Sequence, residues 1–320
     1  MERIHITDVA PRDGLQNQRA LLSTEVKVEL IRRLAAAGLR RVEATSFVSP
    51  KAVPQMADAA EVLAGIAELS GLQPSVLVPN MKGLARAQAA GAREVAVVLS
   101  ATDTMNRRNI GMSLDEATRV SEETLQAALG AGLAARAYVA VAFECPFEGR
   151  VDRARVVDLA QRMALAGARE VVIADTIGAA APAQVSRLLA DLRDTLPRER
   201  TAVHFHDTRG FGCANAWAAL EAGVRRFDAS TGGLGGCPFA PGATGNICTE
   251  DAVHMLQSMG YDTGIDLDRL LACSKQIPEL VHHGVPGQVV HAGPWNTRHR
   301  VPSDFEAIRT RALERDAQQA

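Results

Sequence analysis

The chain contains 320 residues, of which 47% are hydrophobic and 22% charged, a composition typical of globular proteins rather than disordered or fibrous ones. Its formal net charge of −2 argues against a nucleic-acid partner, because such proteins carry a basic surface. No run approaches the ~20 apolar residues of a membrane-spanning helix, and we recognise no targeting peptide. The five cysteines form no Cys-x-x-Cys pair, so neither a disulfide framework nor a zinc ribbon is expected. We expect a cytoplasmic protein without a membrane partner.

Eight strands alternate with eight helices in the predicted order of elements. The strands are expected near residues 3–8, 40–45, 74–79, 94–99, 134–142, 170–175, 201–206 and 225–230. The helices are expected near residues 24–37, 54–67, 82–90, 114–131, 151–166, 183–195, 212–222 and 249–259. Ser23, Ser113 and Thr249 are plausible N-caps. The strands are continuous apolar runs, as expected where both faces of a sheet are buried.

Four segments repeat one pattern, in which a small-residue helix end is followed by a glycine and an apolar run. They span residues 35–43, 89–97, 165–173 and 220–228. We interpret each as a helix with a glycine C-cap, a short turn and a buried strand. Eight strand–helix units predict a (β/α)8 TIM barrel. A doubly wound open sheet is the alternative, because alternation does not prove that the sheet closes.

The strand–helix pattern ends near residue 286. We therefore expect a TIM-barrel catalytic domain over residues 1–286 and a short C-terminal extension over residues 287–320. Alternating charge over residues 303–317 indicates that this tail is partly helical and that its helix faces solvent.

Polar residues follow the ends of several predicted strands, and these ends meet at one face of a TIM barrel, where active sites lie. They are Asp8, Arg12 and Asp13 with strand one, Glu43 with strand two, Asp175 with strand six, His204 and His206 with strand seven, and Cys237 and Asn246 after strand eight. His204 and His206 share one face of their strand. Two imidazoles with the nearby oxygens of Asp13 and Asn246 indicate a divalent metal site. The alternative is a pair of buried, hydrogen-bonded histidines.

The other polar residues each allow two interpretations. Arg12 either stabilises a developing anion or forms a salt bridge that holds its loop. Glu43 and Asp175 either orient a ligand or form ion pairs. Cys237, which follows four glycines, is a candidate proton donor or nucleophile, whereas small buried apolar roles are favoured for Cys145, Cys213, Cys248 and Cys273.

These motifs resemble those of the 3-hydroxy-3-methylglutaryl-CoA lyases, which are metal-dependent TIM-barrel lyases. The resemblance covers residues 4–275 and is carried by Pro11–Asn17, Thr45–Lys51, Val53–Met56, Pro79–Asn80, Cys145–Gly149, Asp175–Gly178, His204–Thr208 and Gly232–Asn246. The cysteine loop, Gly-Gly-Leu-Gly-Gly-Cys-Pro-Phe-Ala, is the most specific of them. Related Claisen synthases usually carry His-x-His-Asn-Asp and lack this loop.

The resemblance implies cleavage of 3-hydroxy-3-methylglutaryl-CoA to acetyl-CoA and acetoacetate, in a homodimer or larger oligomer. It implies that Asp13, His204, His206 and Asn246 bind Mg²⁺ or Mn²⁺. It also implies that Arg12 stabilises the enolate, that Cys237 or His204 protonates its carbon, and that Glu43 and Asp175 support the site. The alternatives are a lyase acting on citramalyl-CoA or a longer 3-alkyl analogue, a Claisen-type synthase, and a non-catalytic barrel.

The sequence departs from the family pattern at several positions. Asp8 replaces a glutamate, and Arg209 replaces the usual tyrosine. Phe143 and Glu144 follow strand five, where we expect them to reshape the substrate pocket. The polar residues that contact CoA in relatives align loosely with residues 281–283.

Overall fold

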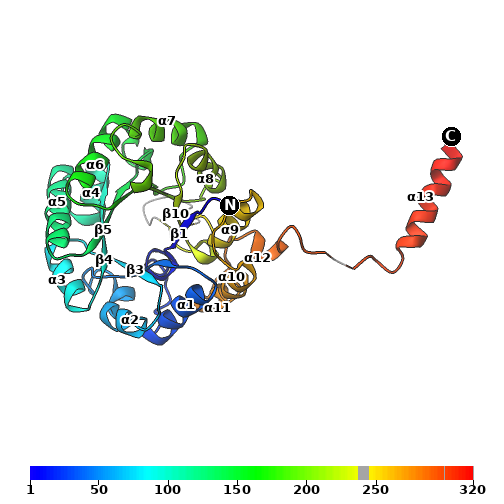
Figure 1. Cartoon of the computed structure of the whole chain (residues 1–320), viewed down its shortest axis with the longest axis horizontal. Helices are drawn as coiled ribbons and strands as arrows, with labels where there is room; N and C mark the ends of the chain where they lie inside the picture. Colours follow the sequence, from blue (N-terminus) through cyan, green and yellow to red (C-terminus); the bar gives the residue numbers. More distant parts are fainter. Residues whose placement is uncertain (237–244, 299, 320) are drawn as a thin grey trace.

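The computed structural model describes residues 1–236, 245–298 and 300–319. Eight parallel strands close into a barrel in the order β1-β10-β9-β8-β5-β4-β3-β2 (Figure 1). They are β1 (His5–Asp8), β2 (Arg41–Ser46), β3 (Gln73–Leu77), β4 (Glu94–Ser100), β5 (Ala134–Ala140), β8 (Glu170–Asp175), β9 (Thr201–Phe205) and β10 (Arg226–Ala229). The predicted TIM barrel is confirmed and the open sheet is excluded, since β1 pairs with both β2 and β10.

A ring of helices surrounds the barrel (Figure 1). The eight that we predicted are α1 (Thr24–Ala36), α2 (Ala59–Gly65), α3 (Met81–Ala89), α5 (Leu114–Gly130), α6 (Arg153–Leu165), α7 (Pro182–Leu192), α8 (Gly212–Glu221) and α9 (Thr249–Ser258). Helix α2 is shorter than expected, because residues 54–56 form a separate 3-10 turn, η2 (Pro54–Met56). Asp58 follows that turn, and its carboxylate binds Thr24 and Lys27 of α1 instead of capping α2.

Several short elements were not predicted. They are η1 (Ala10–Gly14), a π-helical turn, together with α4 (Asp103–Ile110), α10 (Leu267–Ser274), α11 (Ile277–Val281), α12 (Val289–Ala292), the short turns η3 (Arg198–Arg200) and η4 (Thr231–Gly233), and a hairpin of β6 (Glu144–Cys145) and β7 (Gly149–Arg150). Helix α4 reads Asp-Thr-Met-Asn-Arg-Arg-Asn-Ile, and so short and polar a segment gives little apolar periodicity.

The glycines of the four repeats occupy the turns that lead into the strands. Gly38, Gly91, Gly167 and Gly223 have φ values of 99°, 81°, 116° and 94°. These left-handed conformations favour glycine, and each glycine follows the C-cap residue of its helix directly. Each glycine therefore ends its helix as predicted, but from the position one residue beyond the C-cap.

The barrel has two buried regions of different composition, the layer between the helices and the sheet and the lumen inside the sheet. The layer between helices and sheet is apolar and includes fully buried Ile31, Leu34, Leu125 and Leu188, each of which contributes roughly 2 kcal/mol by leaving water. The lumen of the barrel instead holds buried charges such as Arg136, which is 1% exposed. Such charges need partners.

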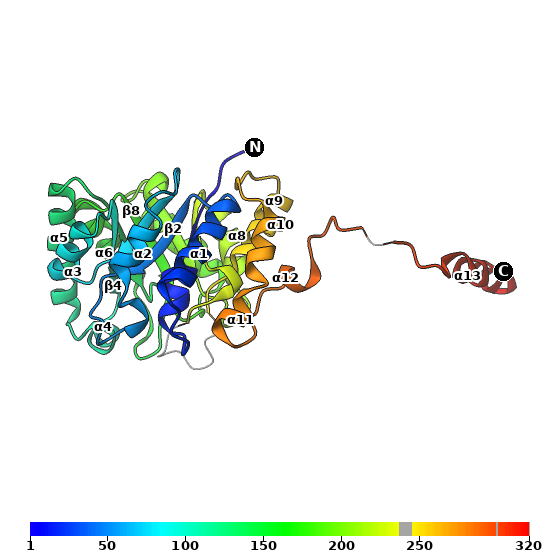
Figure 2. The ribbon, with the colours of Figure 1, turned by 90° about the horizontal axis from the view of Figure 1, so that it is seen from below.

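The C-terminal segment leaves the barrel after α12, where Val289 donates its backbone N–H to Asp251 of α9. Residues 294–304 lead from there to α13 (Phe305–Gln319), which stands apart from the barrel (Figures 1 and 2). In the described part of the chain, no helix is both long enough and apolar enough to cross a membrane.

Candidate metal centre and active site

Two histidines converge at the carboxyl end of β9. His204 and His206 flank Phe205 and therefore point to the same side of the strand, into the barrel. Both are buried, with 6% and 4% of their surface exposed, and their Nε2 atoms lie 3.2 Å apart. One potential ligand atom from each histidine and one from Asp13 all lie within 4.8 Å of one another. The structure thus brings together three of the four predicted metal ligands.

Asn246, the fourth predicted ligand, is held beside this cluster by backbone pairing. It forms an isolated β-bridge with His206, flanked by hydrogen bonds from Asp207 N to Gly245 O and from Ile247 N to Phe205 O. Its Nδ2 atom donates to Asp13 Oδ2 at 2.7 Å and to Leu234 O at 2.8 Å. Its buried Oδ1 atom has no partner.

The π-helical turn η1 carries Arg12 and Asp13 into the site directly after β1. Gly14 lets this turn approach the opposite loop, because a Cβ atom at that position would lie 2.9 Å from Leu234 Cβ. The sequence indicated only a loop here. The turn is compact because both Arg12 and Gly14 donate their backbone N–H groups to Val9 O.

Arg12 lies between two acids. Its Nε and Nη2 atoms bind Glu43 Oε2 at 2.6 and 2.5 Å, and its Nη1 atom binds Asp13 Oδ1 at 3.0 Å. Burial alone would lower the pKa of Arg12, but Glu43 and Asp13 outweigh burial and raise it. Burial raises the pKa of Glu43, and Arg12 opposes this only in part. Glu43 Oε1 is buried without a partner, and the Arg12 guanidinium keeps two N–H groups free of these contacts.

The protonation states favour a cation in this cluster. Burial, together with the neighbouring His204, lowers the pKa of His206 to about 3, so this imidazole is neutral and has a lone pair to offer. Burial would raise the pKa of Asp13, but the charge of Arg12, aided by a hydrogen bond from Asn246, outweighs it and lowers that pKa, which keeps the carboxylate ionised. Two imidazole nitrogens, a carboxylate and an unpartnered amide oxygen form a donor set that suits a divalent metal ion.

A buried network beneath the histidines was not found from the sequence. Asp228 of β10 accepts from Arg136 Nη2 at 2.6 Å and from the Tyr138 hydroxyl at 2.7 Å, and it lies 3.5 Å from His204 Nδ1. A carboxylate in this position orients a metal-binding imidazole. The only sequence indication was that Arg136 and Asp228 are charged residues inside otherwise apolar strands.

Asp175 and Asp8 are structural in this arrangement. Both oxygens of Asp175 accept from backbone N–H groups, those of Ala179 and Ala180, at 2.9 and 3.0 Å. Asp8 is fully buried and accepts from Ala10 N, from both the backbone N–H and the hydroxyl of Thr231, and from the Thr249 hydroxyl. Asp8 therefore ties β1 to η4 and α9.

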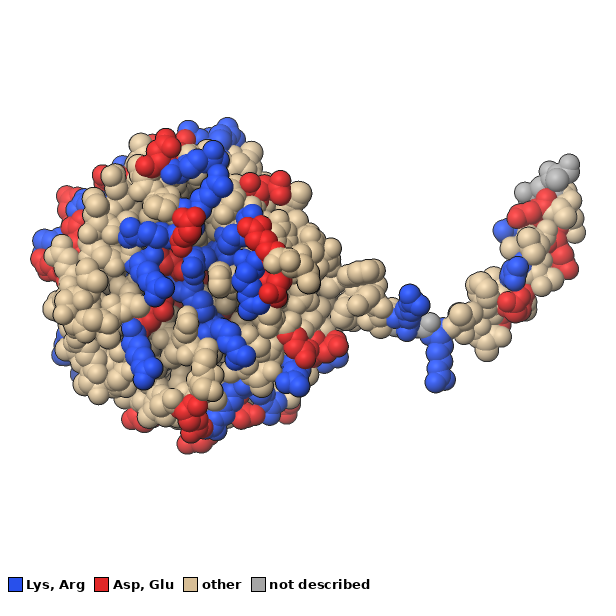
Figure 3. Space-filling view, in the orientation of Figure 1, with Lys and Arg blue, Asp and Glu red and all other residues tan. Residues whose placement is uncertain are grey.

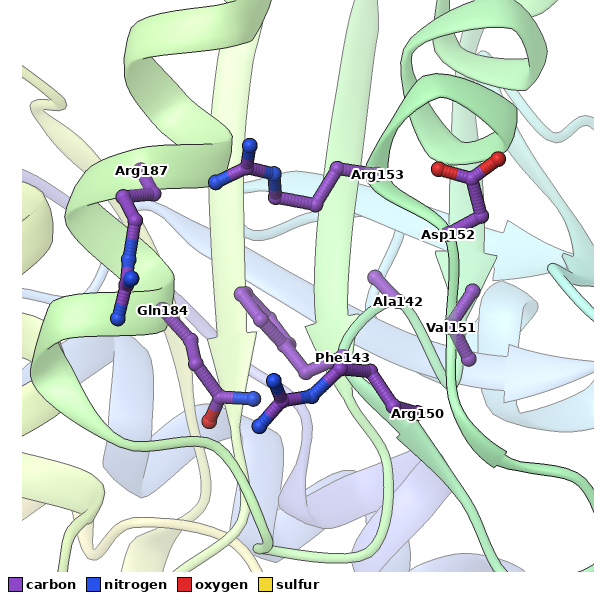
Figure 4. Close-up of a pocket in the computed structure, with 8 residues that line it drawn as sticks. All are labelled: Ala142, Phe143, Arg150, Val151, Asp152, Arg153, Gln184 and Arg187. Carbon is purple, nitrogen blue, oxygen red and sulfur yellow. The ribbon is translucent and has the colours of Figure 1, made fainter.

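The structure places Phe143 and Glu144 against β9 and α7, and their expected effect on the substrate pocket stays a prediction. The Phe143 ring packs against Phe205 with centroids 6.4 Å apart, and Phe205 points to the opposite side of β9 from the histidines. Phe143 lines a cavity of about 550 Å³ with residues of α6 and α7 (Figure 4). Glu144 binds Gln184 of α7.

Three further predicted features have defined positions or fall outside the described residues. Arg209 binds the carbonyl oxygens of Ile177 and Gly178 and so holds the β8–α7 loop. Cys237 lies outside the described residues. Cys145, Cys248 and Cys273 are free and buried, as favoured, whereas Cys213 is free and only partly buried.

Comparison with known proteins identifies the family. The HMGL-like family model matches residues 3–277. The mitochondrial hydroxymethylglutaryl-CoA lyase of Bos taurus is 43% identical over 91% of this chain and 90% of its own length. The cytoplasmic 3-hydroxy-3-methylglutaryl-CoA lyase of Rattus norvegicus is 39% identical over 91% of this chain and 85% of its own length. The chain belongs to the HMGL-like family.

Solved structures support the same relationship. An HMG-CoA lyase from Acinetobacter baumannii, in complex with coenzyme A and 3-methylmalate, has a TM-score of 0.89 and 42% identity over 93% of this chain and 98% of its own. The HMG-CoA lyase from Brucella melitensis has a TM-score of 0.85 and 45% identity over 88% of this chain and 100% of its own. The carboxyl transferase domain of Rhizobium etli pyruvate carboxylase, at 22% identity and a TM-score of 0.66, shares the fold.

Proposed function

We propose that this protein is a hydroxymethylglutaryl-CoA lyase, a metal-dependent enzyme that cleaves 3-hydroxy-3-methylglutaryl-CoA to acetyl-CoA and acetoacetate. The observation that carries the proposal is the convergence of His204, His206 and Asp13 within 4.8 Å, beside Asn246 with its unpartnered Oδ1 atom. The family relationship supports it, because relatives at 39–43% identity carry this name.

We propose that Asp13, His204, His206 and Asn246 hold the metal ion, and that the ion is Mg²⁺ or Mn²⁺. When bound, a divalent cation supplies Lewis acidity to the 3-hydroxyl oxygen of the substrate and lowers the pKa of that hydroxyl. The Asp228 carboxylate, 3.5 Å from His204 Nδ1, keeps the His204 ring in one orientation. The Arg12 guanidinium holds Asp13 Oδ1 at 3.0 Å.

The chain's own residues then carry the reaction as follows. The hydroxyl proton leaves to a base, the C2–C3 bond breaks, and its electron pair forms the enolate of acetyl-CoA while C3 becomes the ketone of acetoacetate. The free N–H groups of Arg12 stabilise the enolate oxygen, and Glu43 holds that guanidinium through two contacts. Cys237 or His204 returns a proton to C2.

The remaining parts of the proposal concern the wider molecule. A cavity of about 420 Å³ lies between residues 233–235 and residues 283–286, and we propose that it takes part of the acyl-CoA substrate. His283 lines it and contacts Gln18 at 2.7 Å. The catalytic domain would span residues 1–286 with residues 287–320 as an accessory tail, in a cytoplasmic homodimer or larger homo-oligomer.

The test is an acetyl-CoA release assay on protein stripped with EDTA, with 3-hydroxy-3-methylglutaryl-CoA as substrate and with or without added Mg²⁺ or Mn²⁺. We expect release only with metal, in amounts equal to the acetoacetate formed. If metal binds but this substrate is not cleaved, the acyl group is wrong. Citramalyl-CoA and longer 3-alkyl analogues would then be assayed, followed by condensation of acetyl-CoA with a 2-oxo acid.

The proposed role of Cys237 has its own test. Cys237→Ser should leave the free energy of unfolding unchanged and lower turnover by about 10²-fold or more, as loss of a proton donor does. Cys213→Ser, on α8, is the matched control and should retain full turnover. Full activity in Cys237→Ser would exclude Cys237 as the proton donor and leave that role to His204.

A further inference from the structure

The amino-terminal mouth of the barrel, at the end opposite the candidate metal site, contains a cavity of about 770 Å³. Its walls come from the starts of the barrel strands, and its lining includes eight arginines but only three glutamates. Figure 3 shows basic side chains gathered at the centre of this face. We call this cavity the arginine basin.

Two of the three glutamates that line the basin, Glu94 and Glu170, are paired with arginines on its floor, and the third, Glu199, is exposed. Glu170 binds Arg136 at 2.6 Å, Arg41 at 2.8 Å and Arg226 at 3.2 Å. Arg41 also binds Glu94 at 3.3 Å. The floor is therefore a closed ion-pair network, and its acids have little capacity left for the arginines of the rim.

Three rim arginines keep their donors free. Arg40, Arg93 and Arg169 are exposed, and none of their guanidinium groups makes a hydrogen bond or an ion pair with any described residue. They come from three separate turns, those before β2, β4 and β8. A single guanidinium offers five N–H donors in a planar fork that matches phosphate oxygens.

The repeated sequence pattern explains how these arginines reach the rim. In each repeat the arginine stands two residues after the glycine whose φ is positive, so the same turn delivers the side chain each time. The fourth such arginine, Arg225, binds Glu2 at 2.7 Å and stacks on Tyr261, and it does not line the basin.

The imidazole of His5 lies close enough to the basin for its pKa to respond to the arginine charges. His5 lines the basin, and its pKa is lowered first by burial and then by the charges of Arg226, Arg41 and Arg3. A bound anion would offset those charges, so the ring of His5 can report on occupancy of the basin.

We propose that the arginine basin binds a small anion bearing several phosphate groups. Several groups suit the site because the free guanidinium groups stand on three different turns around the cavity. Arginine pairs with phosphate through two parallel charge-assisted hydrogen bonds, and this chemistry favours phosphates over singly charged metabolites. The site is separate from the proposed lyase centre and does not depend on that function.

The test is calorimetric titration of the full-length protein with inorganic tripolyphosphate at low salt, in the same excess of MgCl₂ throughout. We expect the triple variant R40Q/R93Q/R169Q to bind at least about tenfold more weakly than the wild type, since three charged donors are lost. The matched control is R225Q, the same repeat position outside the basin, which should keep its affinity within about twofold. A parallel titration with ATP shows whether a nucleoside adds affinity to the phosphates.

Two readouts separate the basin from the lyase centre. The pKa of His5, followed by proton NMR, should rise when tripolyphosphate binds to the wild type and stay unchanged in the triple variant. Turnover of the acyl-CoA substrate without added phosphate should be unchanged in that variant. Absence of binding to the wild type at millimolar tripolyphosphate, or equal affinity of the triple variant and R225Q, would overturn the proposal.

Discussion

The two ends of the barrel differ in the kind of polar group that lacks a hydrogen-bonding partner. At the carboxyl end, the buried atoms without partners include oxygens that can only accept or coordinate, Glu43 Oε1 and Asn246 Oδ1. At the amino end, the groups without partners are the guanidinium donors of Arg40, Arg93 and Arg169. One end therefore offers lone pairs to a cation, and the other offers N–H groups to an anion.

A line of ion pairs that ends in a carboxylate–imidazole contact runs through the lumen and joins the two ends. It runs from Arg41 to Glu170, Arg136, Asp228 and His204, with successive contacts of 2.8, 2.6, 2.6 and 3.5 Å. Each buried charge on this line faces an opposite charge or a polar ring, which offsets the cost of removing it from water. The charges of the lumen are therefore paired with one another and stabilise the barrel, whereas the unpaired groups at its two ends remain available for ligands.

The largest effect should follow from removing a ligand at the carboxyl end. We expect Asp13→Ala to lower turnover by about 10³-fold or more, because the metal ion and Arg12 both lose their partner and transition-state stabilisation is lost. Mn²⁺ binding, followed by electron paramagnetic resonance, should weaken in parallel. Wild-type Mn²⁺ affinity in Asp13→Ala would exclude Asp13 as a ligand.

Asp175→Asn is the control for that variant. Both Asp175 oxygens bind backbone N–H groups, so this substitution should lower the free energy of unfolding while leaving Mn²⁺ affinity close to that of the wild type. A loss of Mn²⁺ affinity as large as that of Asp13→Ala would show that Asp175 belongs to the metal centre.

The second largest effect should be a loss of stability on removing one of the paired charges in the lumen. Arg136→Met leaves Glu170 and Asp228 each short of a buried cation, and we expect it to lower the free energy of unfolding by about 3–5 kcal/mol. Arg93→Gln, on the rim of the arginine basin, should change it by less than about 0.5 kcal/mol. Urea denaturation of both variants measures the difference. Similar losses of unfolding free energy in the two variants would show that Arg93 on the rim stabilises the fold as much as Arg136 on the floor.

The features predicted well from sequence are those that depend on local pattern. The strands lie within a few residues of their predicted positions, because apolar runs bounded by glycine turns mark them. The proximity of Asp13, His204 and His206 was predicted because parallel strands bring their carboxyl ends to one face. This inference requires only the positions of the strands in the sequence, and it does not require knowledge of how the side chains pack.

The features that were missed depend on backbone conformation or on register. Val141 adopts a φ of 48° just after β5, a conformation rare for a β-branched residue and one that nothing in its sequence indicates. The chain beyond it carries Phe143 onto the outer face of the barrel. The pairing of Arg136 with Asp228, 92 residues apart, is visible only once the order of the strands is known.

The smallest expected effect concerns the pKa of a buried glutamate, which differs between the two ends of the barrel. Burial would raise the pKa of Glu170, but Arg136 and Arg41 outweigh it and lower that pKa. Glu250, at the start of α9, accepts from the Ser274 hydroxyl and from Gly232 N, and burial raises its pKa to about 7. The pKa values of these two glutamates thus shift in opposite directions, because Arg136 and Arg41 face Glu170 whereas the groups that act on Glu250 include no arginine.

This difference predicts how stability changes with pH. Between the ordinary glutamate pKa of 4.5 and about 7, the folded protein keeps a proton on Glu250 that the unfolded chain releases. Stability should therefore fall as the pH rises through this window, by about 2–3 kcal/mol between pH 5 and 8. Urea denaturation should show this contribution in the wild type and in E279Q, an exposed control on α11, but not in E250Q. An unchanged pH dependence in E250Q would mean that another group causes the fall, and that the carboxyl end neutralises Glu250 as fully as the amino end neutralises Glu170.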